Sequence, residues 1–326
     1  MSGLVSVAMA TYNGAKYLEA QLRSILEQSY GSLEVIISDD ASTDETYELV
    51  RKMSFSDSRV KAFRQPKNLG LVRNFLDAAG LCKGDFICFS DQDDIWQSQK
   101  IETLVNLLKK NPSAMLAYSD LEICDESMKT IQGSFWKASQ ITPRRGCLHE
   151  KALLKNGAPG CSMMFRRRTK ELISVLLSDE NFLRINQAKI LDEIPVMHDH
   201  LAWVLSAGLG EVIFTPQSLV KYRQHSQNNI GAFYKTQWEI ERFVKCLEAR
   251  IEALKAVQRE LPCVDWAAMR DFLDIYRRPD RPPMPGQMSY FIWMRNNRLR
   301  DKFLGILDCL APSLYRSLKT RIAGTP

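Results

Sequence analysis

Hydrophobic positions in the first 110 residues follow two alternating periodicities. Short, nearly continuous apolar runs are typical of buried β-strands, and they occur at residues 4–10, 33–38, 60–63 and 86–90. Between these runs, apolar residues recur at intervals of three and four. This spacing predicts amphipathic helices at residues 16–28, 70–79 and 98–110, with another helix opening at Ser42 or Thr43. Strands that alternate with helices predict an α/β fold with a parallel, twisted sheet.

The pattern becomes mixed after Pro112. Extended segments are expected at residues 114–118, 162–165, 212–214 and 218–223, and helices at residues 148–155, 169–177 and 199–206. From about residue 236 to residue 259, apolar positions with three-and-four spacing predict one long amphipathic helix, and a further helix is expected at residues 265–276. The C-terminal part of the chain is therefore expected to be helical.

Polar side chains follow three of the expected strands at the points where the strands end. They are Thr11–Asn13 after the first strand, Asp39–Asp40 after the second and Asp91–Asp94 after the fourth. Ligands bind at the carboxyl ends of parallel strands, in the crevice where these ends meet. We therefore expect the three polar clusters to converge in one crevice.

The segment Asp91–Asp94 carries three carboxylates within four residues. Such groups repel one another unless a cation or solvent screens them, and Mg²⁺ and Mn²⁺ prefer oxygen ligands. Asp91 and Asp93 are one residue apart, so both can face the same side at a strand end. The pattern predicts a divalent metal site, although an acidic surface turn or a non-catalytic calcium-binding or carbohydrate-binding module would have the same local sequence.

Charge is unevenly distributed along the 326 residues. The chain has 44 Lys and Arg against 38 Asp and Glu, a net charge of +6. Residues 277–321 hold ten basic and three acidic side chains, so the remainder is near neutral, which argues against nucleic-acid binding. The basic, aromatic stretch at residues 288–321 fits peripheral contact with an anionic membrane, and it fits equally a helix that packs on the rest of the protein.

The cysteines and the apolar runs indicate a cytoplasmic protein. None of the eight cysteines forms a C-x-x-C pair, and several lie in apolar runs, which is typical of reduced core thiols. No apolar run approaches the roughly 18 residues that a membrane-spanning helix needs.

Several segments together resemble the family 2 glycosyltransferases, which have an A-type nucleotide-diphospho-sugar-binding fold. The segments are residues 5–14, 37–44, 68–70 with Asn74, 89–96, 160–165, 198–203 and 222–225. The forms Ser-Asp-Gln-Asp-Asp-x-Trp and Tyr-Arg-Gln-His-x-x-Asn are most similar to bacterial rhamnosyltransferase-type members that build O-antigen or other surface polysaccharide.

The resemblance implies one Rossmann-like A-type glycosyltransferase domain with a mixed, mostly parallel central sheet. The expected catalytic domain is residues 1–230, with a nucleotide-binding half at 1–110 and an acceptor half at 111–230. Residues 231–326 are expected to form a C-terminal helical region.

The resemblance also implies roles for single residues. Asp93 is expected to bind the metal, Asp91 to contact the ribose or the metal, Asp40 to read a pyrimidine base, and Asp199 to act as the catalytic base. The other expected nucleotide contacts are Thr11, Tyr12, Asn13 and Asn68. The expected donor or acceptor contacts are Asp94, Trp96, Gly160, Trp203 and Arg223, although Trp96 fits a core position better and Gly160 fits a simple tight turn equally well.

The chemistry of sugar transfer gives an independent reason for a carboxylate such as Asp199. An acceptor hydroxyl must lose its proton during attack, and carboxylates that hold a cation cannot accept it. Asp199 could instead be a helix N-cap. His225 could ligate Mn²⁺ or donate to a diphosphate oxygen, with Arg223 on the same face, or it could be a loop histidine without a ligand.

The sequence therefore predicts a cytoplasmic, inverting glycosyltransferase that depends on Mg²⁺ or Mn²⁺. The expected reaction moves L-rhamnose from dTDP-L-rhamnose to a hydroxyl of a glycan or lipid-linked glycan acceptor, with peripheral contact at the inner face of the cytoplasmic membrane. Two alternatives remain, which are the same chemistry with a UDP-hexose donor and a metal-dependent nucleotidyltransferase.

Overall fold

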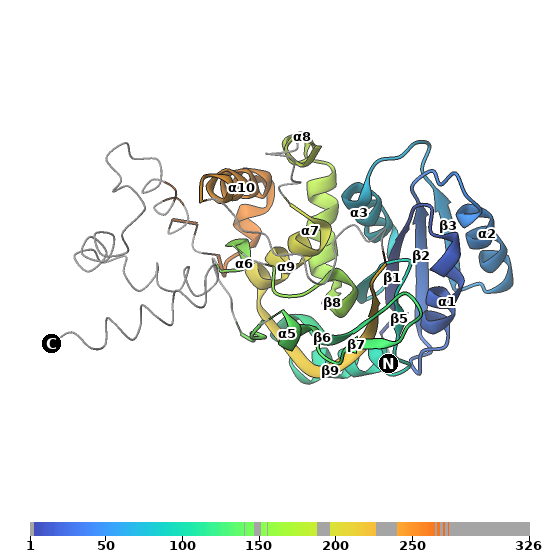
Figure 1. The fold of residues 1–326 in the computed structure, drawn as a ribbon. Coiled ribbons are helices and arrows are strands. Elements are labelled where there is room, and N and C mark those ends of the chain that lie inside the picture. Colours follow the sequence, from blue (N-terminus) through green and yellow to red (C-terminus); the bar gives the residue numbers. More distant parts are fainter. Residues whose placement is uncertain are drawn as a thin grey trace.

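The computed structural model describes residues 3–139, 141–146, 151–154, 156–187, 196–225, 240–264, 266, 267, 270 and 273. Within this part of the chain, nine strands form one sheet in the order β3-β2-β1-β4-β8-β6-β9-β5, with β7 paired to β6 (Figure 1). The strands are β1 (Val5–Thr11), β2 (Leu33–Asp39), β3 (Val60–Arg64), β4 (Phe86–Ser90), β5 (Ile95–Trp96), β6 (Ala114–Cys124), β7 (Thr130–Gln132), β8 (Met163–Arg166) and β9 (Glu211–Arg223).

Helices follow most of the strands. They are α1 (Ala15–Leu26), α2 (Thr46–Ser56), α3 (Leu71–Leu81), α4 (Lys100–Lys110), α5 (Phe135–Ala138), α6 (Lys151–Leu154), α7 (Arg167–Leu177), α8 (Glu180–Gln187), α9 (His198–Leu209) and α10 (Ile240–Ala253), with 3₁₀ turns at Gly160–Ser162 and Lys255–Glu260. The four strands and the helices expected before residue 112 are all present. In these described residues, no helix combines the length and apolar character needed to cross a membrane.

The sheet is mixed and mostly parallel, which confirms the predicted fold class. Strands β1, β2, β3 and β4 are parallel to one another, and so are β6 and β9. Strand β8 lies antiparallel between β4 and β6, so all six of those strands point the same way. Their carboxyl ends therefore meet at one edge of the sheet.

Two apolar layers cover the two faces of the sheet. Alternate residues of β1 point to opposite faces, and every residue of this strand is buried. Val7 packs in the layer that contains residues of α1 and α4, whereas Ala8 packs in the layer that contains residues of α3, α7 and α9. Figure 1 shows α1 on one side of the sheet and α3, α7 and α9 on the other. Burial on both faces explains why the strand sequences are continuous apolar runs.

The acceptor half differs from the sequence prediction in strand length. Residues 212–214 and 218–223 were expected to be separate segments, but they belong to the single strand β9. The register against β6 pairs Ser119 with Thr215 and Asp120 with Ser218, so Pro216 and Gln217 are extra residues in β9. Proline cannot donate to the sheet, and a bulge is the position where a strand tolerates it.

The predicted helix at residues 236–259 is described only from Ile240 onward. There α10 is followed by a 3₁₀ turn from Lys255 to Glu260. Most of the helix predicted at 265–276, and all of the basic stretch at 288–321, lie outside the described residues.

Candidate active site

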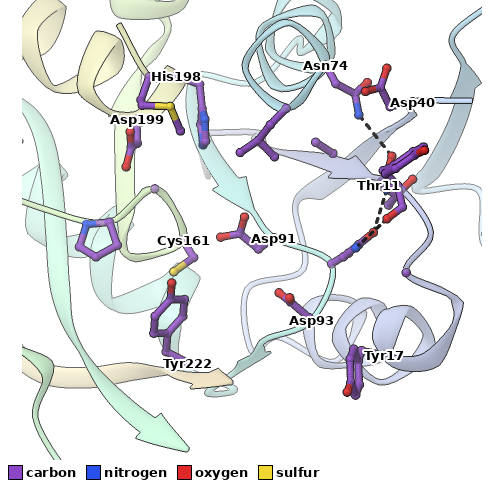
Figure 2. Close-up of a pocket in the computed structure, with 18 of the residues that line it drawn as sticks. Thr11, Tyr17, Asp40, Asn74, Asp91, Asp93, Cys161, His198, Asp199 and Tyr222 are labelled. Carbon is purple, nitrogen blue, oxygen red and sulfur yellow. Dashed lines mark hydrogen bonds between the residues drawn. The ribbon is translucent and has the colours of Figure 1, made fainter. Parts of the chain in front are cut away.

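A pocket of about 730 Å³ lies at the carboxyl edge of the sheet. Side chains from all three polar strand ends line it, together with residues of the acceptor half (Figure 2). The predicted site residues on its wall are Thr11, Tyr12, Asn13, Asp40, Asn68, Asp91, Asp93, Gly160, Asp199 and His225. The predicted contacts Asp94, Trp96, Trp203 and Arg223 are not part of the wall.

Asp91 and Asp93 face the pocket from the loop after β4. Burial and the nearby charges of Asp93 and Asp199 together raise the pKa of Asp91 to about 7. Figure 2 shows Asp91 and Asp199 directed toward the same space, with Asp93 next to Asp91 on the side away from Asp199. Nε2 of His225 lies 2.8 Å from Oδ2 of Asp93. This set of oxygen and nitrogen donors fits a hard divalent cation, which would relieve the repulsion between the carboxylates.

Asp94 is turned away from the pocket, into the protein. Its side chain is fully buried, and Oδ1 accepts a hydrogen bond of 3.1 Å from the backbone N–H of Arg223. Burial raises the pKa of Asp94 well above its usual value, and the charges of Asp93 and Asp91 act in the same direction. Asp94 is therefore part of the floor beneath the pocket, which corrects the prediction that it contacts the donor or acceptor.

A buried lysine lies in the same floor. Nζ of Lys100 donates to the carbonyl oxygen of Cys161 at 2.6 Å and lies 3.0 Å from the ring centroid of Trp96. Side-chain atoms of Asp91, Asp94 and Cys161 lie within 4.8 Å of one another, so they could hold a metal ion. The ammonium group of Lys100 interacts with all three, and burial lowers its pKa to about 8. Positive charge is thus already present on the inner side of the acidic loop. Trp96, which lies against this ammonium group, is a buried core residue.

The side chain of Asp40 organises the turn before α3. Its two oxygens accept hydrogen bonds from the backbone N–H groups of Leu69 (2.6 Å) and Gly70 (2.9 Å). Asn74, in the first turn of α3, donates to the carbonyl oxygen of Ser38 at 2.8 Å. Its Oδ1 atom is buried and has no hydrogen-bond partner among the described residues. Both side chains line the pocket, so Asn74 adds a second polar group near the predicted base position.

Asp199 faces the opposite side of the pocket, in the first turn of α9. The N-cap of this helix is Met197, so the alternative that Asp199 is itself the N-cap is wrong. Oδ1 of Asp199 accepts a hydrogen bond of 2.7 Å from the backbone N–H of His200. Burial raises the pKa of Asp199 to about 6, although hydrogen bonds from His200, Gly160 and Asn156 oppose this effect. The side chain is therefore a more basic carboxylate than a solvated aspartate.

The two histidines that flank Asp199 are neutral. His198 stacks on Phe75 with 3.9 Å between ring centroids, and Nε2 of His200 lies 2.8 Å from the carbonyl oxygen of Ala152. Burial lowers the pKa of each imidazole to about 3. Neither histidine therefore contributes a positive charge to the carboxylate between them.

Trp203 and Arg223 support the site from positions behind its wall. Trp203 is buried against Tyr118, with 5.4 Å between ring centroids. The guanidinium group of Arg223 donates to the carbonyl oxygen of Asp93 at 2.7 Å and lies 4.6 Å from the ring centroid of Tyr17. These positions correct the prediction that Trp203 and Arg223 contact the sugar or phosphate directly.

Several pocket residues were missed by the sequence analysis. Asn156 lines the pocket and donates to Asp199, and Tyr222 and Tyr17 contribute to the wall. Gln92 lies inside the acidic segment that was singled out, but it was treated as a spacer. Tyr222 stands in the Tyr-Arg-Gln-His segment, whereas no local pattern marks Asn156.

Comparisons with known proteins agree with this geometry. A sequence model of the family described as glycosyl transferase family 2 matches residues 6–173. One relative is UDP-Glc:alpha-D-GlcNAc-diphosphoundecaprenol beta-1,3-glucosyltransferase WfgD of Escherichia coli. The two sequences are 33% identical over 166 residues, and this match covers 51% of this chain and 61% of that protein. It is 27% identical over 230 residues to dTDP-rhamnosyl transferase RfbG of Shigella flexneri, which covers 69% and 74% of the two chains.

The fold is similar to that of a solved structure. S. aureus TarS 1–349, solved in complex with UDP-GlcNAc, superimposes with a TM-score of 0.53 at 16% sequence identity. The match covers 94% of this chain and 79% of that one. At this level of identity the likeness concerns the fold alone.

Proposed function

The chain belongs to glycosyl transferase family 2, and on this premise we propose that its pocket moves one sugar from a nucleotide-diphospho-sugar to an acceptor hydroxyl with inversion. One observation carries the proposal: Asp91, Asp93 and Asp199 line the same pocket although Asp199 lies 106 positions after Asp93 in the sequence. One side of this pocket suits a diphosphate with its cation, and the other side suits the incoming alcohol.

On the donor side, Asp93, Asp91 and His225 would hold Mg²⁺ or Mn²⁺. When bound, the cation supplies positive charge that stabilises the departing diphosphate. Arg223 holds the carbonyl of Asp93 from behind, so this loop keeps its shape. Because Lys100 already supplies positive charge beneath the loop, we assign the metal to the outer, pocket-facing side, at Asp91 and Asp93.

On the acceptor side, Asp199 takes the proton of the attacking hydroxyl. A carboxylate with a pKa of about 6 is ionised at neutral pH. It is also a stronger base than a solvated aspartate, so it accepts the proton of the acceptor hydroxyl more readily. Asn156 and Gly160 hold it through hydrogen bonds, so it points into the pocket. The neutral imidazole of His198 forms the adjoining wall.

The donor we propose is dTDP-L-rhamnose, with a UDP-hexose as the alternative. The name of the Shigella flexneri relative supports the former, and the name of the Escherichia coli relative supports the latter. Both donors carry a pyrimidine, for which Asp40 and Asn74 offer acceptor oxygens. Membership of this family does not favour the nucleotidyltransferase alternative.

The acceptor we propose is a glycan or lipid-linked glycan used in surface polysaccharide synthesis. The Escherichia coli relative is named for a diphosphoundecaprenol-linked substrate. The pocket wall also includes Phe135, Ile141, Pro159 and Met197, which offer apolar surface to the faces of a sugar ring. Residues 1–230 as the catalytic domain, residues 231–326 as a helical region and contact of the basic C-terminal stretch with the inner membrane face stay predictions.

The test is a donor panel offered to the purified full-length chain. Binding and nucleoside diphosphate release are measured for dTDP-L-rhamnose, UDP-glucose, UDP-N-acetylglucosamine and GDP-mannose, with Mn²⁺ and with EDTA. We expect metal-dependent turnover of dTDP-L-rhamnose. Turnover of a UDP-hexose alone supports the alternative donor, and preference for the GDP sugar contradicts the pyrimidine role of Asp40.

A further inference from the structure

The loop after β1 is held by side chains from two other loops. Four consecutive backbone N–H groups in it each donate to a side-chain oxygen. The pairs are Tyr12 to Gln92 (2.9 Å), Asn13 to Ser42 (3.0 Å), Gly14 to Thr46 (2.8 Å) and Ala15 to Asp44 (3.3 Å). Three of these acceptors belong to the segment after β2. The fourth, Gln92, belongs to the acidic loop after β4.

Gln92 makes a two-way contact with the backbone of Tyr12. Its Oε1 accepts from the N–H of Tyr12, and its Nε2 donates to the carbonyl oxygen of the same residue at 3.1 Å. An amide can do both, whereas an ionised carboxylate at this position has no proton to donate. A Cβ atom on Gly14 would lie 2.1 Å from Oε1 of Gln92, so glycine at this position leaves the room that the amide occupies.

The contact joins the two parts of the pocket that a donor must use together. The ring of Tyr12 is 45% exposed and lines the pocket on the nucleotide side. Asp91 and Asp93 flank Gln92 and line the pocket on the metal side. When one of these loops is ordered by a ligand, the hydrogen bonds of Gln92 lower the entropy cost of ordering the other.

We propose that Gln92 is a positioning residue that couples the nucleotide subsite to the divalent-cation subsite through the backbone of Tyr12. This inference rests on the proposed function, because it needs a nucleotide and a cation to share the pocket. Coupling between two sites is a factor by which one ligand changes the affinity for the other. A bound cation would also contact the diphosphate directly, but that contact would be the same in every variant and would cancel when variants are compared.

The experiment measures the Kd of UDP and of dTDP by calorimetry, with saturating Mn²⁺ and with EDTA. The ratio of the two Kd values gives the coupling factor for the wild type, Gln92→Met and Ser42→Ala. Ser42→Ala is the matched control, because it removes a hydrogen bond to the same loop without touching the acidic loop. We expect Gln92→Met to lower the coupling factor by about tenfold, the scale of two net hydrogen bonds. Ser42→Ala should raise the Kd measured with Mn²⁺ and the Kd measured with EDTA by the same factor.

A second variant reaches the same contact from the other side. Gly14→Ala leaves Gln92 unchanged, but its methyl group displaces the amide from Tyr12. We expect the same loss of coupling, including in the case that Gln92→Met does not fold. Equal coupling factors in the wild type and the variant that folds overturn the inference while the proposed function stands. A wild type that binds neither nucleotide overturns both.

Discussion

Replacing Asp199 with asparagine should lower the turnover rate and raise the stability of the protein. The substitution keeps the shape of the side chain. It also keeps one oxygen for the backbone N–H of His200, which in the wild type donates to Oδ1 of Asp199 at 2.7 Å. It removes the carboxylate that accepts the acceptor proton. Loss of a general base lowers kcat by about 10²–10⁴-fold. We expect this loss with little change in the Kd of UDP or dTDP, because the nucleotide contacts lie on the other side of the pocket.

The same substitution should stabilise the protein at neutral pH. The pKa of Asp199 is about 6 in the folded protein against 3.8 for an ordinary aspartate, so the folded state binds this proton more tightly than the unfolded chain. Above pH 6 both states are ionised, and burial of the charge costs the folded state up to about 3 kcal/mol. The hydrogen bonds from Asn156 and Gly160 are already included in this pKa, so asparagine should gain up to about 3 kcal/mol.

The pH dependence follows from the same pKa. As pH falls through 6 toward 4, Asp199 becomes protonated in the folded protein and the cost of the buried charge disappears. The stability advantage of Asp199→Asn should therefore shrink over this range. In the wild type, kcat should fall below about pH 6, because the protonated carboxyl cannot accept a proton.

The assay measures nucleoside diphosphate release at saturating donor and chemical unfolding at pH 7.5 and pH 5. Asp179→Asn is the control and should leave the rate unchanged, because Asp179 does not line the pocket and asparagine keeps an oxygen for the backbone N–H of Phe182. A variant that unfolds more easily than the wild type at pH 7.5, or a kcat within threefold of the wild type, would refute the reasoning about Asp199.

Three further predictions test other parts of the pocket. Asp93→Asn removes a charged ligand and should raise the Kd for Mn²⁺ at least about tenfold by calorimetry; an unchanged Kd contradicts the metal assignment. His225→Ala should lower kcat at saturating donor about tenfold and affect turnover more than Tm, since the imidazole contacts Asp93; an unchanged kcat removes it from the site. Gly157→Ala should cost about 1–3 kcal/mol of stability, because the added Cβ would lie 2.3 Å from the ring of Trp203; an unchanged unfolding midpoint contradicts the packing of this turn.

The carboxyl-edge residues were predictable because they depend on local pattern and on a general rule. Asp40 and Asp93 follow apolar runs, and the ends of parallel strands share one edge of the sheet. The resemblance to the family added Asp199, whose sequence position alone does not distinguish a base from an N-cap. The structure removes only the N-cap alternative, because α9 begins at His198 with Met197 as its N-cap.

Side-chain direction in the loops was not predictable in the same way. Asp93 and Asp94 are adjacent in sequence, yet the first faces the pocket and the second is fully buried. The difference comes from Arg223 in β9, whose backbone N–H donates to Asp94 although the two residues are far apart in sequence. Gln92 was likewise treated as a spacer, because its partner Tyr12 lies 80 residues earlier in the sequence.

The sequence by itself determined the α/β architecture, the family and the strand ends at which the chemistry occurs. These features follow from hydrophobic periodicity and short motifs, which act within a few residues. Only the tertiary structure decided which acidic side chains line the pocket, that Trp203 belongs to the core, and that Gln92 joins two loops. Those outcomes depend on hydrogen bonds and packing between distant segments, which no local pattern records.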